Sequence, residues 1–294
     1  MIKNLPENVA GTVYIFISAL MYATLPIMAK VVYSTGIEPL YLFWLRYLFA
    51  FIMIAGYFLL TKQGPVISVS RMVIFQGLLV VLSGVFYFIS LKYLAAGMCS
   101  IIFFTHPVIV SVLALVIFRE KVVPRLLLGL LLAVTGIFMI SGTLGNSIIN
   151  LPAKGLIYCI LSCLTYAGYL LAGQKNLASS SPLSMASTFA FLGIVLVPLF
   201  FGRSAGFFTS VSMLQLLLIL AMALINTILP MFFLLSGVKK IGASRGSLIS
   251  SVEPVLTIII AYLALGEVLA PIQLAGSALV FVSIILALPS EPKI

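Results

Sequence analysis

The chain has 294 residues, of which 63% are hydrophobic and 7% are charged, against roughly 25% charged residues in soluble domains. A 31.7 kDa chain of this composition cannot bury its apolar surface in water, which excludes a soluble protein and predicts an integral membrane protein. The net charge of +10 comes from Lys and Arg residues scattered between apolar runs, which excludes a nucleic-acid-binding protein and instead reports membrane topology.

Apolar runs long enough to cross a bilayer, about 20 residues each, recur along the chain between short polar breaks. They predict an all-α protein with ten transmembrane helices, because the strands of a membrane barrel alternate in polarity and these runs are apolar on every side. The expected helices are 9–33, 40–60, 70–91, 97–118, 124–141, 153–174, 183–201, 211–236, 243–265 and 270–288. No clear cleavage site follows the first run, so we interpret it as a retained helix.

The positive charges are distributed unevenly between the two sides of these helices. One alternating set of loops holds only Lys30, Lys92, Lys154 and Arg203 of the 16 Lys and Arg residues, and Arg46 lies inside the second helix. The other loops and both termini hold the rest. By the positive-inside rule, both termini are expected in the cytoplasm, with the protein in the inner or plasma membrane.

The second half of the chain repeats the first. A shift of 147 residues, from Pro107 to Pro254, also pairs Glu120 with Glu267 and needs no gap over this region. The pattern predicts two five-helix units, 1–145 and 150–294. Because five is odd, the two units must cross the membrane in opposite orientations. Inverted repeats are typical of secondary transporters, in which two similar halves rock about a site at the membrane midplane.

The sequence resembles the EamA family of the drug/metabolite transporter superfamily over nearly its whole length. The first helix has ALMYATLPIMAK, with Lys30 in the family position, although Tyr22 and Ala23 replace the usual Trp-Gly pair. The second has PLYLFWLRY, with Arg46 in the position of the family arginine. Two ordered motif sets follow, which run from Tyr87 through Pro107 and Glu120 to Gly129, and from Glu253-Pro254 through Glu267 to Gly276. The resemblance implies a ten-helix transporter of small metabolites, and some family members export amino acids.

Glu253 is the sharpest functional candidate, because it lies near the centre of the ninth helix. A carboxylate at that depth must be paired, hydrated or protonated. A protonatable group at the midplane is what proton-coupled antiport requires, since proton and substrate can compete for it. The alternative is a structural role, in which Glu253 bonds a neighbouring helix.

His106 occupies the equivalent position in the first half, and it is the only histidine. It could bind substrate or titrate, or stay neutral in a structural hydrogen bond. Pro107 and Pro254 each free the carbonyl four residues earlier, so we expect kinks there, and we interpret both prolines as hinges. A static kink is the alternative.

Further polar side chains at membrane depth are expected to line a cavity at the midplane, because the lipid-facing surface must be apolar. Packing between helices is the alternative for the serines. The complete set of predicted substrate-binding residues is Tyr22, Ser83, Tyr87, His106, Tyr166, Tyr169, Asn226, Ser250 and Glu253. Lys30 and Arg46 are expected near the outer ends of their helices. They would form a gate or an ion pair with Glu38, and the alternative is that their side chains only extend to the lipid headgroups.

The sequence thus predicts a secondary transporter, and not an enzyme, that exports small metabolites by alternating access. Tyrosines, hydroxyls and one carboxylate suit amino acids or related amphipathic solutes; hydrophobic drugs or sugar-like metabolites are the alternative. No motif for a metal or cofactor is present, so none is expected. The expected partners are a small substrate and the lipid bilayer, with either a monomer or a homodimer. The alternatives of another class are an integral membrane enzyme and a non-transporting assembly protein.

Overall fold

The computed structural model describes residues 6–62, 66–68, 70–90, 93–94, 102–118, 124–140, 152–176, 181–201, 211–265 and 270–287. Within these residues the protein is entirely helical, without any strand. Five continuous helical stretches are long and apolar enough to cross a membrane: Glu7–Tyr33, Leu40–Thr61, Ala153–Gly173, Pro182–Leu199 and Met213–Ile241. The structure is therefore an all-α protein with several helices able to span a bilayer.

Several of the expected helices are split into two. The elements are α1 (Glu7–Ala23), α2 (Leu25–Tyr33), α3 (Pro39–Thr61), α4 (Arg71–Ser90), α6 (His106–Phe118), α7 (Pro124–Ile140), α8 (Ala153–Asn176), α9 (Pro182–Phe201), α10 (Met213–Ala223), a π-helical segment (Leu224–Ile228), α11 (Leu229–Ile241), α12 (Ala243–Ser250), α13 (Glu253–Leu265) and α14 (Pro271–Ala287).

Within the described residues the helix boundaries agree with the predicted ranges within a few residues, except at the end of the eighth. The expected start of the fourth helix at residue 97 lies outside the described residues. The eighth helix was expected to end at residue 236, with a loop after it, but α11 continues to Ile241. Lys239 and Lys240 lie in its last turn, where cations favour the carbonyl end of a helix. Gly242 follows with a φ of 83°, a conformation that glycine adopts without strain, and so ends the helix.

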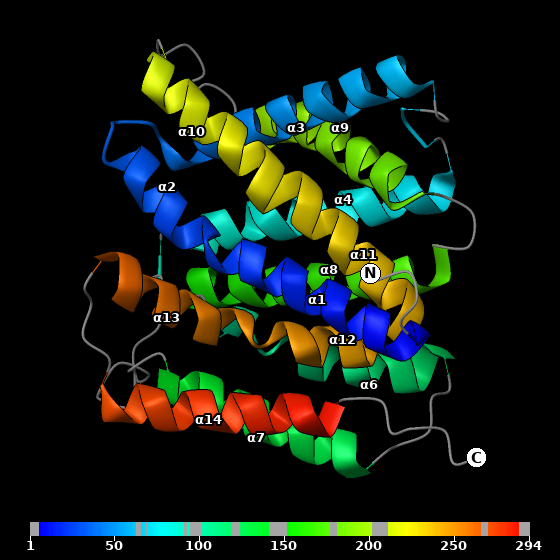
Figure 1. Ribbon diagram of the computed structural model, residues 1–294, viewed down its shortest axis with the longest axis vertical. Helices are drawn as coiled ribbons and strands as arrows, with labels where there is room; N and C mark the ends of the chain where they lie inside the picture. The colour runs from blue at the N-terminus through cyan, green and yellow to red at the C-terminus, as the bar shows by residue number, and fades with distance from the viewer. Residues whose placement is uncertain are drawn as a thin grey trace.

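The helices pack in pairs that join the two halves of the chain (Figure 1). Near one end of the molecule α7 lies against α14, and near the other end α3 lies against α9. Between them α1 packs on α11, α4 on α8 and α12 on α6. Each of these contacts pairs an element of the first half with one of the second.

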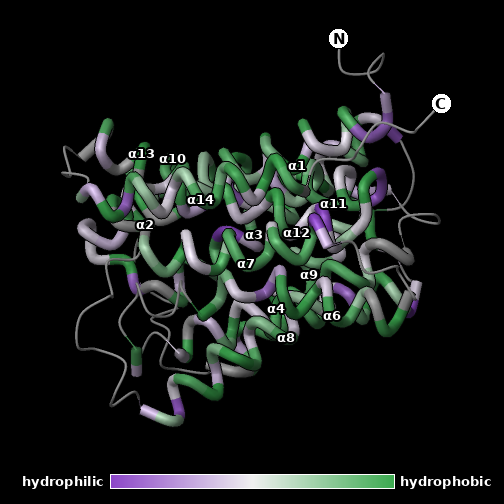
Figure 2. Tube along the Cα trace, turned by 90° about the horizontal axis from the view of Figure 1, so that it is seen from below, coloured by the Kyte–Doolittle hydropathy of each residue, from purple (hydrophilic) through white to green (hydrophobic). Residues whose placement is uncertain are grey.

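The approach of α1 to α11 depends on two facing glycines. A Cβ added at Gly11 would lie 2.6 Å from a side-chain carbon of Ile241, and one at Gly237 would lie 2.9 Å from the carbonyl oxygen of Gly11. Small residues of this kind let the backbones of membrane helices pack closely. Hydrophobic residues cover most of the helices (Figure 2), so polar groups in the interior stand out.

Candidate functional site

In the part of the chain that the structure describes, four interruptions divide helices in the interior, and a proline follows each of them. The breaks lie at Thr24, at Phe104–Thr105, at the π-helical segment Leu224–Ile228 and at Ser251–Val252. The helical segments that follow begin with Leu25-Pro26, His106-Pro107, Leu229-Pro230 and Glu253-Pro254. Proline is well suited to the first turn of a helix but cannot donate a backbone hydrogen bond to the turn before. Kinks were expected at Pro107 and Pro254, and the structure has a break of two residues shortly before each of them.

The carbonyls freed by proline are satisfied by side chains at three places. Pro107 leaves the carbonyl of Phe103, which faces Nδ1 of His106 at 3.0 Å. Pro230 leaves the carbonyl of Asn226, and Nη2 of Arg46 donates to it at 3.2 Å. In α9, Pro198 lies inside the helix, and the carbonyl four residues earlier, that of Ile194, accepts the indole N–H of Trp44 at 3.1 Å.

Arg46 is thus a buried residue of the interior of α3, with 8% of its surface exposed. Its Nε and Nη2 also reach the hydroxyl of Thr227 at 3.3 and 3.2 Å. Arg46 therefore does not bond the predicted partner, Glu38, in the structure. The π-helical segment offers Arg46 oxygen atoms inside the bundle, whereas Glu38 is exposed just before α3. Lys30 lies in α2, and its side chain is outside the described part of the structure.

Asn226 connects two of the breaks directly. Its Nδ2 donates to the carbonyl of Met21 at 2.7 Å and to the hydroxyl of Thr24 at 2.8 Å. The hydroxyl of Thr257 in α13 reaches the carbonyl of Ala23 at 3.3 Å, beside the same break. Asn226, predicted as a substrate-binding residue, therefore holds the interruption of one helix against that of another.

His106 and three aromatic residues form a continuous chain of ring contacts. The ring of His106 lies 4.8 Å from that of Tyr166, edge to face, and 5.3 Å from that of Phe103. Tyr166 in turn lies 5.5 Å from Tyr169. The imidazole is buried, with 1% exposed.

Glu253 begins α13 and follows the break at Ser251–Val252. Tyr22 and Tyr166 both lie within electrostatic reach of its carboxylate. All three residues are only partly buried, although they lie within the bundle. In the described part of the chain, no hydrogen bond reaches the carboxylate of Glu253. A carboxylate that no described side chain bonds, within reach of two tyrosines, can accept hydrogen bonds from a solute and attract a cation.

Other predicted residues belong to the packing of the helices. Ser83 and Ser162 exchange hydrogen bonds between α4 and α8, each hydroxyl reaching the other's carbonyl at 3.0 and 2.9 Å. Ser250 donates to the carbonyl of Gly246 in its own helix at 2.9 Å. Tyr87 packs edge to face on Phe103, with ring centroids 5.3 Å apart.

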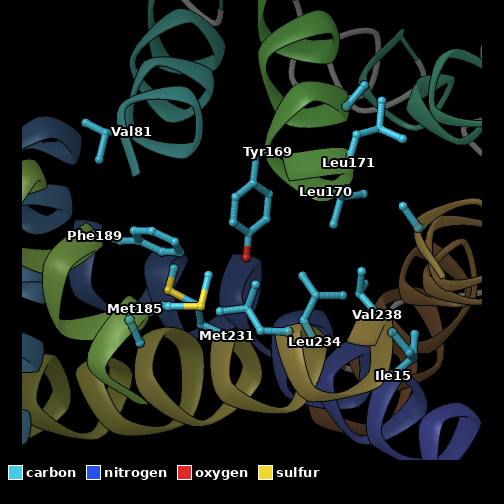
Figure 3. Packing of buried hydrophobic residues seen from close by; sticks show 14 of the residues in the cluster. Ile15, Val81, Tyr169, Leu170, Leu171, Met185, Phe189, Met231, Leu234 and Val238 are labelled. Atoms are coloured by element: carbon cyan, nitrogen blue, oxygen red, sulfur yellow. The ribbon is translucent and has the colours of Figure 1, made fainter. Parts of the chain in front are cut away.

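Tyr169 points from α8 into an apolar region near Met231 and Leu234 of α11 (Figure 3). Its ring packs edge to face against Phe189, with centroids 5.9 Å apart. The site thus centres on Tyr22, Tyr166, His106 and Glu253, and Tyr169 lies deeper in the core.

The sequence model of the EamA-like transporter family matches residues 9–142 and again residues 153–288. The chain belongs to the EamA-like transporter family. The family expected from the sequence is therefore confirmed. The protein is a multi-pass membrane protein of the transporter type. The EamA-like fold holds the interrupted helices and their polar residues at the centre of the bundle.

Relatives in bacteria and archaea cover most of the chain. The uncharacterized transporter YcbK of Bacillus subtilis is 26% identical over 95% of this chain and 93% of its own length. The uncharacterized transporter sll1319 of Synechocystis is 31% identical over 74% of this chain and 68% of its own. A protein of known crystal structure shares the fold, with a TM-score of 0.84 and 16% identity over 95% of this chain and 96% of the other.

Sequence reasoning missed several residues of this EamA-like site. It assigned no role to Thr24 or Thr227 and interpreted Cys163 only as a small packing residue, although the Sγ of Cys163 lies 3.1 Å from the carbonyl of Ile102, beside the break before His106. The available signal was the prolines themselves. Pro26 and Pro230 have the same relation to their breaks as Pro107 and Pro254 have to theirs.

Proposed function

We propose that this EamA-like protein is a secondary transporter that exports a small amphipathic metabolite, an amino acid or a related solute, by alternating access. Ten transmembrane helices would form two inverted five-helix repeats, 1–145 and 150–294, with both termini in the cytoplasm. The proposed substrate site consists of Tyr22, Tyr166, His106 and Glu253.

One observation carries the proposal: helix breaks that contact one another lie near a carboxylate, that of Glu253, which no described side chain bonds. Asn226 joins the breaks of the first and eighth predicted helices, Thr257 joins the ninth to the first, and Tyr166 links Glu253 to His106. Interrupted helices at membrane depth are tolerated where they are enclosed by protein or line a water-filled path. Transporters place substrate and coupling ions at such discontinuities.

The pairing of the helices supports inverted repeats. The contact of α1 with α11 joins the first and eighth predicted helices, and that of α4 with α8 joins the third and sixth. In the two repeats the first helix corresponds to the sixth, and the third corresponds to the eighth. If each helix is replaced by its counterpart, the contact between the first and eighth helices becomes the contact between the sixth and third. The contact of α7 with α14 is converted into itself. Two halves related in this way could rock against each other about the proposed site.

Within this mechanism Glu253 is proposed to carry the coupled proton, because a substrate amine would compete with the proton for the same carboxylate. Pro107 and Pro254 are proposed as hinges, since the turns before them lack a backbone hydrogen bond. Lys30 stays a proposed gate residue near the outer end of α2.

The proposal is tested by counterflow in proteoliposomes that contain purified, folded protein. Labelled amino acids and amphipathic amines are offered outside vesicles loaded with the same unlabelled solute. We expect transient accumulation of at least one solute, which excess unlabelled solute abolishes, and an acid shift reported by a pH dye if protons are coupled. Flat traces across this panel would contradict the amino-acid-like substrate class, and a parallel panel of hydrophobic drugs and sugars would then test the alternative.

A further inference from the structure

Six of the predicted helices form two sets, and hydrogen bonds join the members of each set. The 1/8/9 set is the first, eighth and ninth predicted helices, which are α1, α2, α10, the π-helical segment, α11, α12 and α13. The 3/4/6 set is the third, fourth and sixth, described as α4, α6 with the turn before it, and α8. The two sets lie on opposite sides of the molecule, the first in front in Figure 1 and uppermost in Figure 2.

The 1/8/9 set is bonded from one end to the other. Its bonds, from the end where α1 begins, are Lys240 to Glu7 at 3.4 Å, Ser18 to the carbonyl of Pro230 at 2.8 Å, Asn226 to that of Met21 at 2.7 Å, Thr257 to that of Ala23 at 3.3 Å and Gln215 to that of Thr35 at 2.9 Å. Each bond joins a residue of the first half of the chain to one of the second. The two halves therefore share this set.

The 3/4/6 set is bonded in the same way. The two serine bonds described above join α4 to α8, and Nε2 of Gln76 in α4 donates to the carbonyl of Tyr169 in α8 at 3.1 Å. Sγ of Cys163 in α8 lies 3.1 Å from the carbonyl of Ile102, before α6. The repeat relates the first helix to the sixth, the third to the eighth and the fourth to the ninth, so it exchanges one set for the other.

The contact between the sets is apolar where its side chains are described. Tyr169 of the 3/4/6 set points towards Met231 and Leu234 of the 1/8/9 set (Figure 3), and its buried hydroxyl has no hydrogen-bond partner. A Cβ at Gly173 would lie 3.5 Å from Cδ2 of Leu235, an ordinary van der Waals distance across the same contact. Apolar packing has no fixed direction and can part and re-form, whereas breaking a buried hydrogen bond leaves unsatisfied groups.

This contact is confined to one end of the molecule. Among the described helices, α12 packs on α6, and α11 and α12 pack on α8, whereas α2, α10 and α13 make no comparable contact with α4, α6 or α8. The helix breaks separate α11 from α10 and α12 from α13, and α11 and α12 lie at the end where α1 begins (Figure 1). The two sets are therefore closed against each other on one side of the breaks only.

We propose that the 1/8/9 set and the 3/4/6 set, and not the two sequence halves, are the bodies that rock against each other. The contacts of α11 and α12 with α6 and α8 form an inner gate, on the proposed cytoplasmic side. The inference rests on the proposed alternating access and identifies the parts that move. When this gate opens, the outer segments close. The repeat relates Gly173 to Ala29 by a shift of 144 and Leu235 to Phe88 by a shift of 147, so residues 29 and 88 become neighbours in the opposite state.

Two cross-links separate motion of the sets from motion of the halves. Residues 7 and 240 belong to different halves but to one set, whereas residues 173 and 235 belong to the second half but to different sets. Each pair is replaced by cysteine in full-length protein whose three native cysteines are replaced by alanine. Counterflow of a solute that the panel identifies is measured before treatment with a short bifunctional thiol reagent, after it, and after reduction.

We expect the link in Gly173→Cys/Leu235→Cys to abolish counterflow in proportion to the fraction cross-linked, with recovery on reduction. The link in Glu7→Cys/Lys240→Cys should leave counterflow unchanged. Loss of counterflow with the second link, or none with the first, overturns the inference.

A further measurement needs neither a substrate nor position 173, where a Cβ would also meet Nε2 of Gln76 at 2.7 Å. Ala29→Cys/Phe88→Cys protein is oxidised in membranes, and the disulfide is detected by mass spectrometry of its peptides. We expect this disulfide to form, and none in Ala29→Cys/Phe75→Cys, because Phe75 lies near the other end of α4. Absence of the 29–88 disulfide, or equal formation of both, overturns the inference.

The two readouts keep this inference apart from the proposed function. A 29–88 disulfide without exchange of any solute would uphold the motion of the sets and refute the carrier. Counterflow that the 7–240 link blocks and the 173–235 link does not would uphold a carrier and refute these moving bodies.

Discussion

His106 and Glu253 occupy equivalent places in the two halves of the chain, yet their surroundings differ. Each begins a helix, precedes a proline and follows an interrupted turn. In the first of these turns the N–H of Thr105 donates to the carbonyl of Ile102, and in the second the N–H of Val252 donates to the carbonyl of Ile249. His106 is buried and closes its break by bonding the carbonyl of Phe103. Glu253 is only partly buried, and no described side chain bonds its carboxylate.

The difference shows how a repeated backbone can hold two kinds of site. The sulfhydryl of Cys163 on α8 supports the break before His106, at 3.1 Å from the carbonyl of Ile102. Near the other break, Ser250 and Ser251 bond carbonyls of their own helix. In the first half, side chains bond the carbonyls beside the interruption, whereas in the second no described side chain bonds the carboxylate of Glu253.

The largest effect is expected from Glu253→Gln, which keeps the shape of the side chain and removes its charge. Hydrogen bonds to a charged group are worth about 1.5–3 kcal/mol, so counterflow of an amine substrate should fall by roughly one to two orders of magnitude. The control is Glu38→Gln. Normal counterflow in folded Glu253→Gln protein would show that this carboxylate does not bind the substrate.

A large loss of stability is expected from Arg46→Met. The substitution leaves the carbonyl of Asn226 and the hydroxyl of Thr227 without their buried donor, at a cost of about 1–3 kcal/mol for each unsatisfied group. Thermal unfolding in detergent should show a clearly lower midpoint, with Arg46→Lys intermediate. Lys154→Met, at an exposed position of α8, provides the control, and an equal midpoint for both variants would disprove the assigned role.

His106→Phe and Glu253→Gln sharpen the comparison when their stabilities are measured side by side. Loss of the bond to the Phe103 carbonyl should lower the unfolding free energy by about 1–2 kcal/mol. Glu253→Gln should leave it within about 0.5 kcal/mol, because no described partner is lost. If Glu253→Gln is less stable than His106→Phe, then Glu253 stabilises the fold, contrary to the contrast drawn between the two residues.

The smallest effect is expected at Cys163. Its thiol is a weak donor, so Cys163→Ala should cost about 1 kcal/mol or less, and Cys163→Ser, which keeps a donor, should cost less than the Ala variant. Thermal midpoints measured with Cys159→Ala, at a second buried cysteine, distinguish loss of the hydrogen bond from loss of volume. Equal midpoints for Cys163→Ala and Cys163→Ser would show that the bond to Ile102 contributes nothing.

Hydropathy and the positions of polar and proline residues predicted the helices well. A bilayer demands long apolar runs, and Pro107 and Pro254 mark local breaks. The end of α11 was missed, since lysines resemble a loop although they are favourable in a last turn. The partners of Arg46 and Asn226 could not be predicted, because they join segments 180 and 205 residues apart. The roles of Ser83 and Tyr87 were equally hidden, since facing a neighbouring helix and facing a substrate leave the same pattern in a sequence.

The bond from Asn226 to Met21 has a consequence for biogenesis. The first helix leaves the ribosome long before the eighth, so the carbonyl of Met21 and the hydroxyl of Thr24 must enter the membrane before their amide partner is synthesised. In the nascent chain the N–H and hydroxyl of Thr24 can already bond the carbonyl of Met21, and Asn226 then fixes this break against the eighth predicted helix. We expect chains truncated before residue 224 to insert and yet stay sensitive to membrane proteases, and chains that extend through α11 to become resistant.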